Sequence, residues 1–198
     1  WLWLWISSIE RSAKIMIIYL DMDGVLADFF GGLEKKFKVN HWKDIKDIND
    51  ALDQLRDTNF FWNLEPFDTT YPLVGHVKEL THKYPHLDWG ICSTPLRNDR
   101  DNCTYWKRRW LETHNLMPNK VGSKTKNLIF THTKHKFATN RVDGTPNILV
   151  DDKHTNVKSW TEAGGLGILW QANRDRISKL EDELAKAIKL IQKVRGDF

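Results

Sequence analysis

The chain has 198 residues, a length that suits one domain, or a core with a small insert, and allows a sizeable core. Its composition, 40% hydrophobic and 28% charged, is typical of a soluble globular protein. The formal charge of +4 favours anionic ligands in a general way. It does not establish nucleic-acid binding, because 30 basic and 26 acidic residues are interspersed along the chain.

The cysteine content excludes a disulfide framework and a cysteine-based metal cluster. Only Cys92 and Cys103 are present, and Cys92 lies within an apolar run, where it is best interpreted as a small buried side chain. A reducing, cytoplasmic setting is therefore expected.

The N-terminal segment, residues 1–15, begins with the apolar sequence WLWLWI. It has no basic leader and is far too short to span a membrane. Because Met16 lies immediately before the first convincing strand, we expect residues 1–15 to be an extension outside the functional domain, residues 16–198. An edge strand or a dimer contact formed by the tryptophans is the alternative, so a homodimer stays open.

The most informative stretch is IIYLDMDGVLADFF, in which an apolar run ends in Asp21 and Asp23. Side chains two residues apart in a strand point to the same side, so both carboxylates can reach one site. Gly24 then allows a tight turn close to a ligand. Two neighbouring anions need a shared cation or proton, which indicates Mg²⁺ and a phosphorylated substrate. A strand that ends in a common Asp-Gly turn is the structural alternative.

Two further apolar runs, residues 87–95 and 147–153, also predict buried parallel strands, since they are nearly continuous rather than alternating. Shorter runs at residues 120–130 and 165–171 can each hold one more strand. Helical patterns separate these runs, at residues 72–84, 101–114 and 156–163 and from residue 174 onward. The alternation predicts an α/β doubly wound, Rossmann-like parallel sheet.

In such sheets ligands bind at the carboxyl ends of the strands. Polar side chains follow three of the predicted strands at this edge: Asp21, Asp23, Ser93, Thr94, Asp151 and Asp152. Between the first two of these strands lies a long interval without a strand pattern, which we interpret as a small helical cap at about residues 30–85. Ordinary crossover helices are the alternative, although a single crossover needs fewer residues.

These motifs resemble the haloacid dehalogenase-like phosphohydrolase superfamily, and within it the 5′(3′)-deoxyribonucleotidases. DMDGVLADFFGG is similar to the first motif of the family, ICSTP to the second, and ILVDDKHTN to the fourth. The segment THTKHKFA resembles the part of the family that carries the third motif, a lysine. It favours Lys134, with Lys136 as the alternative.

The resemblance implies an aspartyl-phosphate mechanism on (deoxy)ribonucleoside 5′- or 3′-monophosphates. Asp21 is the expected nucleophile, Asp23 the general acid and base, and Lys134 offsets phosphoryl charge. Mg²⁺ is expected on the Asp21 carboxylate, the Asp23 backbone carbonyl and the acids Asp151 and Asp152. A strand cannot point both of these acids the same way, and the family parallel favours Asp152 as the direct ligand.

Substrate contacts are expected from Ser93 and Thr94 to the phosphate and from Phe29, Phe61 and Trp62 to the base. For the aromatic cluster at residues 60–62, a place in the core of the cap is an equal alternative. A phosphatase of the same superfamily acting on a sugar phosphate or another small phosphomonoester is the second hypothesis. A non-catalytic module that binds phosphate or nucleic acid, supported by the lysines of residues 120–136, is the third. We expect a small nucleotide, rather than a nucleic acid or a membrane, as the partner.

Overall fold

The computed structural model describes residues 15–118, 120–121 and 124–195. The predicted extension, residues 1–15, lies outside the described residues except for Ile15. Five parallel strands form the central sheet in the order β5-β2-β1-β6-β7. They are β1 (Met16–Leu20), β2 (Leu87–Ser93), β5 (Leu128–Phe130), β6 (Ile148–Asp151) and β7 (Leu166–Leu169). The predicted parallel α/β sheet is confirmed.

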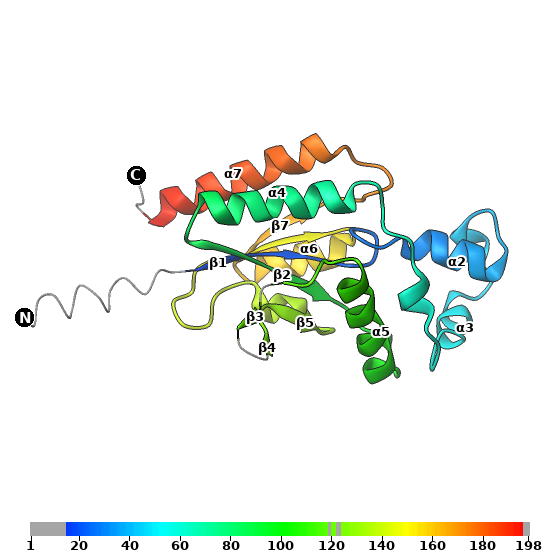
Figure 1. Ribbon diagram of the computed structural model, residues 1–198. Coiled ribbons are helices and arrows are strands. Elements are labelled where there is room, and N and C mark those ends of the chain that lie inside the picture. Colours follow the sequence, from blue (N-terminus) through cyan, green and yellow to red (C-terminus); the bar gives the residue numbers. More distant parts are fainter. Residues whose placement is uncertain (1–14, 119, 122–123, 196–198) are drawn as a thin grey trace, which may run out of the picture.

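Both faces of the sheet are covered, as continuous apolar strands require. On one face, Ile18 and Leu20 of β1 belong to the main core, to which α4 (Thr70–Lys83) and α7 (Ile177–Arg195) contribute. Both helices lie over that face in Figure 1. On the other face, Tyr19 packs with residues of α6 (His154–Glu162) and of the short 3₁₀ helix η3 (Lys134–Phe137). Successive residues of β1 thus serve opposite faces.

A helical segment follows β1 and extends beyond the carboxyl edge of the sheet (Figure 1). It consists of α2 (Phe29–Phe37), η1 (Trp42–Asp44), α3 (Ile48–Asp53) and η2 (Phe60–Asn63). Helix α4, which the predicted range 30–85 includes, packs on the sheet beside β2. The helices α2 to η2 are therefore the part of the interval that lies away from the sheet.

The region between β2 and β6 differs in detail from the prediction. Helix α5 (Arg100–Thr113) packs against η2. The run at residues 120–130 holds a separate antiparallel hairpin, β3 (Lys120–Val121) and β4 (Lys124–Thr125), before β5 joins the main sheet. Among the described residues, no helix has the length and apolar character needed to cross a membrane.

Candidate active site

The aspartates Asp21 and Asp151 meet because β1 and β6 are neighbours. Leu20 is paired with Val150, and the backbone N–H of Asp21 donates to the carbonyl of Val150 at 2.9 Å. The next residue of each strand therefore places a carboxylate at the same point of the sheet edge. Both side chains are buried. Carboxylate oxygens of Asp21, Asp151 and Asp152 all lie within 4.8 Å of one another.

Lys134 brings positive charge to this buried pair. It is 3% exposed, and its Nζ lies 2.9 Å from Asp21 Oδ1 and 2.7 Å from Asp151 Oδ2. Burial alone would lower the pKa of Lys134, but the two aspartates outweigh it and raise that pKa above its ordinary value. Lys136, the alternative in the sequence, is exposed. The structure therefore places Lys134, of these two lysines, against the carboxylates.

Asp151 and Asp152 differ in what already binds them. Asp151 Oδ1 accepts from the backbone N–H of Lys153 and from Asn156 Nδ2, while Oδ2 accepts from Lys134 and Asn156. No donor to the Asp152 carboxylate occurs among the described residues, and this side chain lies against Gly24, where an added Cβ would be 2.5 Å from Asp152 Oδ2. The lone pairs of Asp152 are thus the more available to a cation.

The expectation that these two acids cannot point the same way is wrong. Strand β6 ends at Asp151, so Asp152 no longer follows the alternation of the strand and its carboxylate reaches the same cluster. The hydrogen-bond donors around each carboxylate therefore decide whether Asp151 or Asp152 would bind a cation directly.

Crowding of acids raises their pKa values. Burial, then Asp21 and Asp151, raise the pKa of Asp152 to about 8. Burial and Asp21 also raise the pKa of Asp151 above its ordinary value. Charges held this close and out of water need more positive charge than Lys134 supplies. A cluster of carboxylate oxygens is the ligand set that Mg²⁺ prefers, so these residues fit such an ion.

Asp23 faces a second lysine that the sequence analysis did not single out. Lys107 of α5 is completely buried, and its Nζ donates to Asp23 Oδ2 at 2.6 Å and to Ser93 Oγ at 2.9 Å. It also donates to the backbone carbonyl of Thr94 at 2.9 Å. Burial raises the pKa of Asp23 above its ordinary value, although Lys107 opposes the shift. The Asp23 side chain does not belong to the carboxylate group of Asp21, and its predicted metal-ligating atom is the backbone carbonyl.

Ser93 and Thr94 lie where they were predicted, at the carboxyl end of β2 beside β1. Ser93 is fully buried, and its hydroxyl oxygen accepts from Lys107. Lys107 thus ties the end of β2 to the loop that follows β1. One signal could have found it: Lys107 lies at helical spacing from Cys103, Trp110 and Leu111, all of which are buried.

The aromatic residues divide into two groups. The rings of Phe29 and Phe61 are nearly parallel, with centroids 6.1 Å apart, and Lys107 Nζ lies 4.9 Å from the centroid of Phe61. Phe61 therefore borders the lysine that holds Asp23. Trp62 is instead 43% exposed, packs on Trp106 of α5 and lies 3.4 Å, through Nε1, from Thr113 Oγ1. The structure places Trp62 against α5 rather than beside the carboxylates, and its contact with a base stays a prediction.

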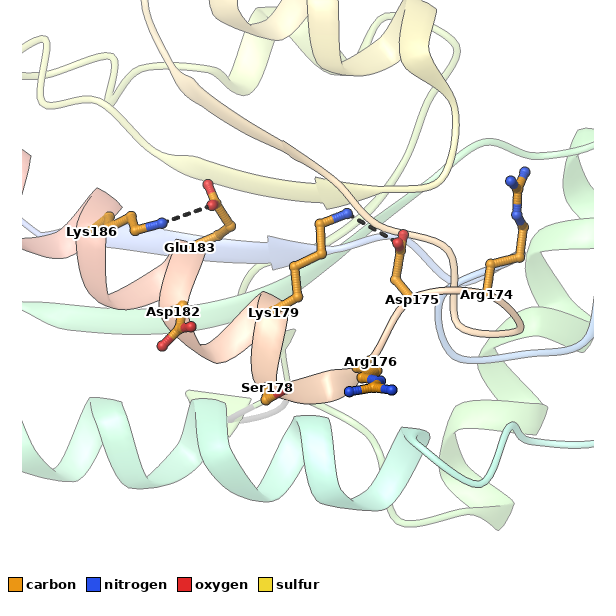
Figure 2. A pocket seen from close by; sticks show the side chains of 8 residues that line it. All are labelled: Arg174, Asp175, Arg176, Ser178, Lys179, Asp182, Glu183 and Lys186. Atoms are coloured by element: carbon orange, nitrogen blue, oxygen red, sulfur yellow. Dashed lines mark hydrogen bonds and ion pairs between the residues drawn. The ribbon is translucent and has the colours of Figure 1, made fainter.

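Two cavities lie away from Asp21, Asp151 and Asp152. One, of about 470 Å³, lies at the beginning of α7 between residues 174 and 186, where Lys179 pairs with Asp175 and Lys186 with Glu183 (Figure 2). The other, of about 230 Å³, lies between α2 and η2. The carboxylates and buried lysines, and not the size of a cavity, therefore identify the carboxyl edge of the sheet as the candidate site.

Comparison with known proteins gives two curated relatives. The chain is 26% identical to the mitochondrial 5′(3′)-deoxyribonucleotidase of Mus musculus over 53% of its length and 55% of the relative. It is 29% identical to the mitochondrial enzyme of the same name from Homo sapiens over 51% of each chain. The resemblance indicated by the motifs is thus confirmed, although the chain spans about half the length of the curated relatives it matches. No family model matches the chain.

Solved structures of similar topology include the HAD domain of an effector protein from Legionella pneumophila. It is 11% identical, with a TM-score of 0.48 over 92% of this chain and 98% of that one. A HAD-superfamily hydrolase from Ehrlichia chaffeensis is 13% identical, with a TM-score of 0.47 over 89% and 98% of the two chains.

Proposed function

We propose that this chain is a Mg²⁺-dependent phosphatase that hydrolyses (deoxy)ribonucleoside 5′- or 3′-monophosphates to nucleoside and phosphate. The observation that carries the proposal is the pairing of Asp21 with Lys134, two residues before Asp23, whose buried Oδ1 has no hydrogen-bond partner among the described residues. The names of the two curated relatives support the substrate class.

Asp21 is suited to be the nucleophile. Its Oδ1 accepts from the backbone N–H of Met22 at 2.7 Å and pairs with Lys134, while Oδ2 has no hydrogen-bond partner among the described residues. In the proposed first step Oδ2 attacks phosphorus, and the bond from phosphorus to the nucleoside oxygen breaks. Lys134 then offsets the charge that develops on the phosphoryl group.

Asp23 is suited to move protons. In the first step it donates a proton to the departing nucleoside oxygen, and in the second it takes a proton from the water that hydrolyses the aspartyl-phosphate. A raised pKa favours the protonated form that the first step needs. Its Oδ1 is buried and has no hydrogen-bond partner in the described part of the chain, so this oxygen is available to carry the proton.

A divalent cation fits the Asp21 and Asp152 carboxylates, with Asp151 next to them. Among these acids, Asp152 is the one that receives no hydrogen bond from the described residues, and burial, then Asp21 and Asp151, raise its pKa above the ordinary value. Mg²⁺, when bound, supplies charge that offsets the phosphate oxygens. The Asp23 backbone carbonyl remains our proposed additional ligand.

The substrate contacts follow from the same edge of the sheet. The Ser93 hydroxyl accepts its hydrogen bond from Lys107, so its own proton is free to be donated to a phosphate oxygen. Thr94 lies next to it, and its carbonyl is held by the same lysine. Phe29 is only partly buried and is the proposed aromatic contact for the base, while the buried Phe61 ring lies parallel to it and supports it. A sugar phosphate is the alternative substrate, since the catalytic residues do not depend on a base.

A phosphate-release screen over nucleoside monophosphates and sugar phosphates, with and without Mg²⁺, tests this proposal. We expect Mg²⁺-dependent release from nucleotides and its loss in Asp21→Asn, with Asp68→Asn, outside the cluster, as the matched control. Absence of turnover of any monophosphate by the wild type would refute the enzyme. Full activity of Asp21→Asn would refute the nucleophile, and a preference for sugar phosphates would favour the alternative substrate.

A further inference from the structure

Lys107 is a cation in a place where cations are rare. Its side chain is completely buried in the middle of α5, on the face that also carries Trp110 and Leu111. A buried ion pair usually stabilises a protein no more than well-packed apolar residues of the same volume would. A methionine or leucine would therefore suit this helix face, and the presence of a lysine calls for a reason other than stability.

The three hydrogen bonds of Lys107 use all of its donors. An ammonium group has three N–H donors, and these go to Asp23 Oδ2, Ser93 Oγ and the Thr94 carbonyl. No N–H remains for a phosphate oxygen. Lys107 is therefore arranged to hold other side chains in place and not to bind the substrate itself.

The consequence for Asp23 is that its two oxygens become different. Oδ2 is fixed by Lys107 at 2.6 Å, whereas Oδ1 is buried and receives no hydrogen bond from the residues that the structure describes. An aspartate held by one oxygen cannot rotate freely about its terminal torsion, so the other oxygen keeps one direction. The Phe61 ring, 4.9 Å from the ammonium, closes the remaining side of the lysine.

We propose that Lys107 is a positioning residue that holds Asp23 with Oδ1 directed at the leaving-group oxygen and Ser93 with its proton directed at the phosphate. The inference rests on the proposed phosphatase function. It predicts that loss of Lys107 impairs proton donation to the leaving group more than any other part of the reaction.

A pair of substrates separates this role from a merely structural one. A nucleoside alkoxide needs a proton in order to leave, whereas p-nitrophenolate is a stable anion and leaves without one. The value of kcat/KM reports the steps up to the aspartyl-phosphate, where the two substrates differ. Since both are measured on one sample, their ratio does not depend on the fraction of protein that is folded.

In Lys107→Met we expect kcat/KM for a deoxyribonucleoside monophosphate to fall by about 100-fold, as for a misplaced general acid. The value for p-nitrophenyl phosphate should fall by less than about 10-fold, because only the orientation of Ser93 is lost. Arg109→Met is the matched control, since Arg109 is exposed on the same helix and pairs with Glu112; it should leave both values unchanged. In an Asp23→Asn background, Lys107→Met should no longer change the ratio.

Equal losses for both substrates, complete loss included, would overturn the positioning role while leaving the phosphatase in place. An unchanged ratio in Lys107→Met would do the same. Lys107→Gln, which keeps a shorter donor, provides a second variant if Lys107→Met does not fold. Absence of wild-type turnover of both substrates would refute the phosphatase itself, and the inference with it.

Discussion

Replacing Lys134 by methionine should destabilise the metal-free protein strongly. The substitution keeps an unbranched side chain, one atom shorter, and removes its charge, so Asp21 and Asp151 lose the cation that lies 2.9 Å and 2.7 Å from them. All three side chains are at most 8% exposed. Removing one partner of a buried ion pair costs about 3–5 kcal/mol, because the other charge stays buried. An exposed pair is worth about 0–1 kcal/mol.

Urea unfolding followed by tryptophan fluorescence measures this difference, since Trp89, Trp110, Trp160 and Trp170 are fully buried in the native state. At neutral pH we expect the free energy of unfolding of Lys134→Met to be lower than that of the wild type by about 3–5 kcal/mol. Lys136→Met, a charge removal two residues away on an exposed side chain, should stay within about 0.5 kcal/mol.

The effect of Lys134→Met should also depend on pH. In the wild type, the pKa of Lys134 is raised above its unfolded value, so its stabilisation is present throughout the neutral and acidic range. Burial and Asp21 raise the folded pKa of Asp151 above its ordinary value, and the variant lacks the Lys134 charge that opposes this shift, so the stability of the variant falls as the pH rises above about 4. The loss should therefore be larger at pH 8 than at pH 5. A loss below about 1 kcal/mol at pH 8, or one that grows as the pH falls, would refute the buried pairing.

Two further substitutions probe the cation and the aromatic contact. The folded pKa of Asp152, about 8, lies above its ordinary value of 3.8, so charging this group costs stability progressively between these pH values. Metal-free Asp152→Asn should therefore unfold at a higher temperature than the wild type at pH 8 and at nearly the same temperature near pH 4. Added Mg²⁺ should no longer raise the unfolding temperature of this variant. A variant that unfolds at a lower temperature than the wild type at pH 8 would contradict the proposed repulsion among the acids. Phe29→Leu should lower kcat/KM for nucleotides by about 10-fold, since Phe29 is only partly buried and aromatic stacking on a base is worth about 1–3 kcal/mol, whereas Trp62→Leu should change it by less than about 2-fold. The reverse order in a nucleotidase assay would show that Trp62, and not Phe29, contacts the base.

The sequence predicts the carboxyl edge of the sheet well because its signals are local. Buried parallel strands are continuous apolar runs, and in this chain β2 and β6 end in residues of the candidate site, while β1 is directly followed by Asp21. Strand β5 has only three residues, and no local pattern distinguishes it from the neighbouring hairpin. Its place beside β2 is decided by packing over a long distance in the chain. The position of Lys134, which follows β5, depends on that same packing.

Trp62 shows a second limit, which concerns the direction of side chains. In a short 3₁₀ helix successive residues point about a third of a turn apart. In η2 this directs Phe60 and Phe61 inward and Trp62 outward toward α5. Aromatic content alone predicts stacking for all three. The direction of each ring is fixed only by how η2 packs on α5, which the sequence of η2 does not contain.

Lys107 shows that a local pattern can carry information when it is violated. Its position fits the apolar stripe of α5, between Cys103 and Trp110. Burying a lysine there costs free energy unless hydrogen-bond acceptors lie within reach of its ammonium group. A buried lysine needs acceptors for three donors, and the carboxyl edge of a parallel sheet that ends in aspartate and serine is one of the few places that offers them. The amino-acid pattern alone can therefore predict that such a lysine contacts the site. The signal is a cation on the apolar face of a helix that follows a strand of this kind. The same reasoning does not extend to Arg108 and Arg109, whose partner Glu112 lies on the exposed surface of the same helix.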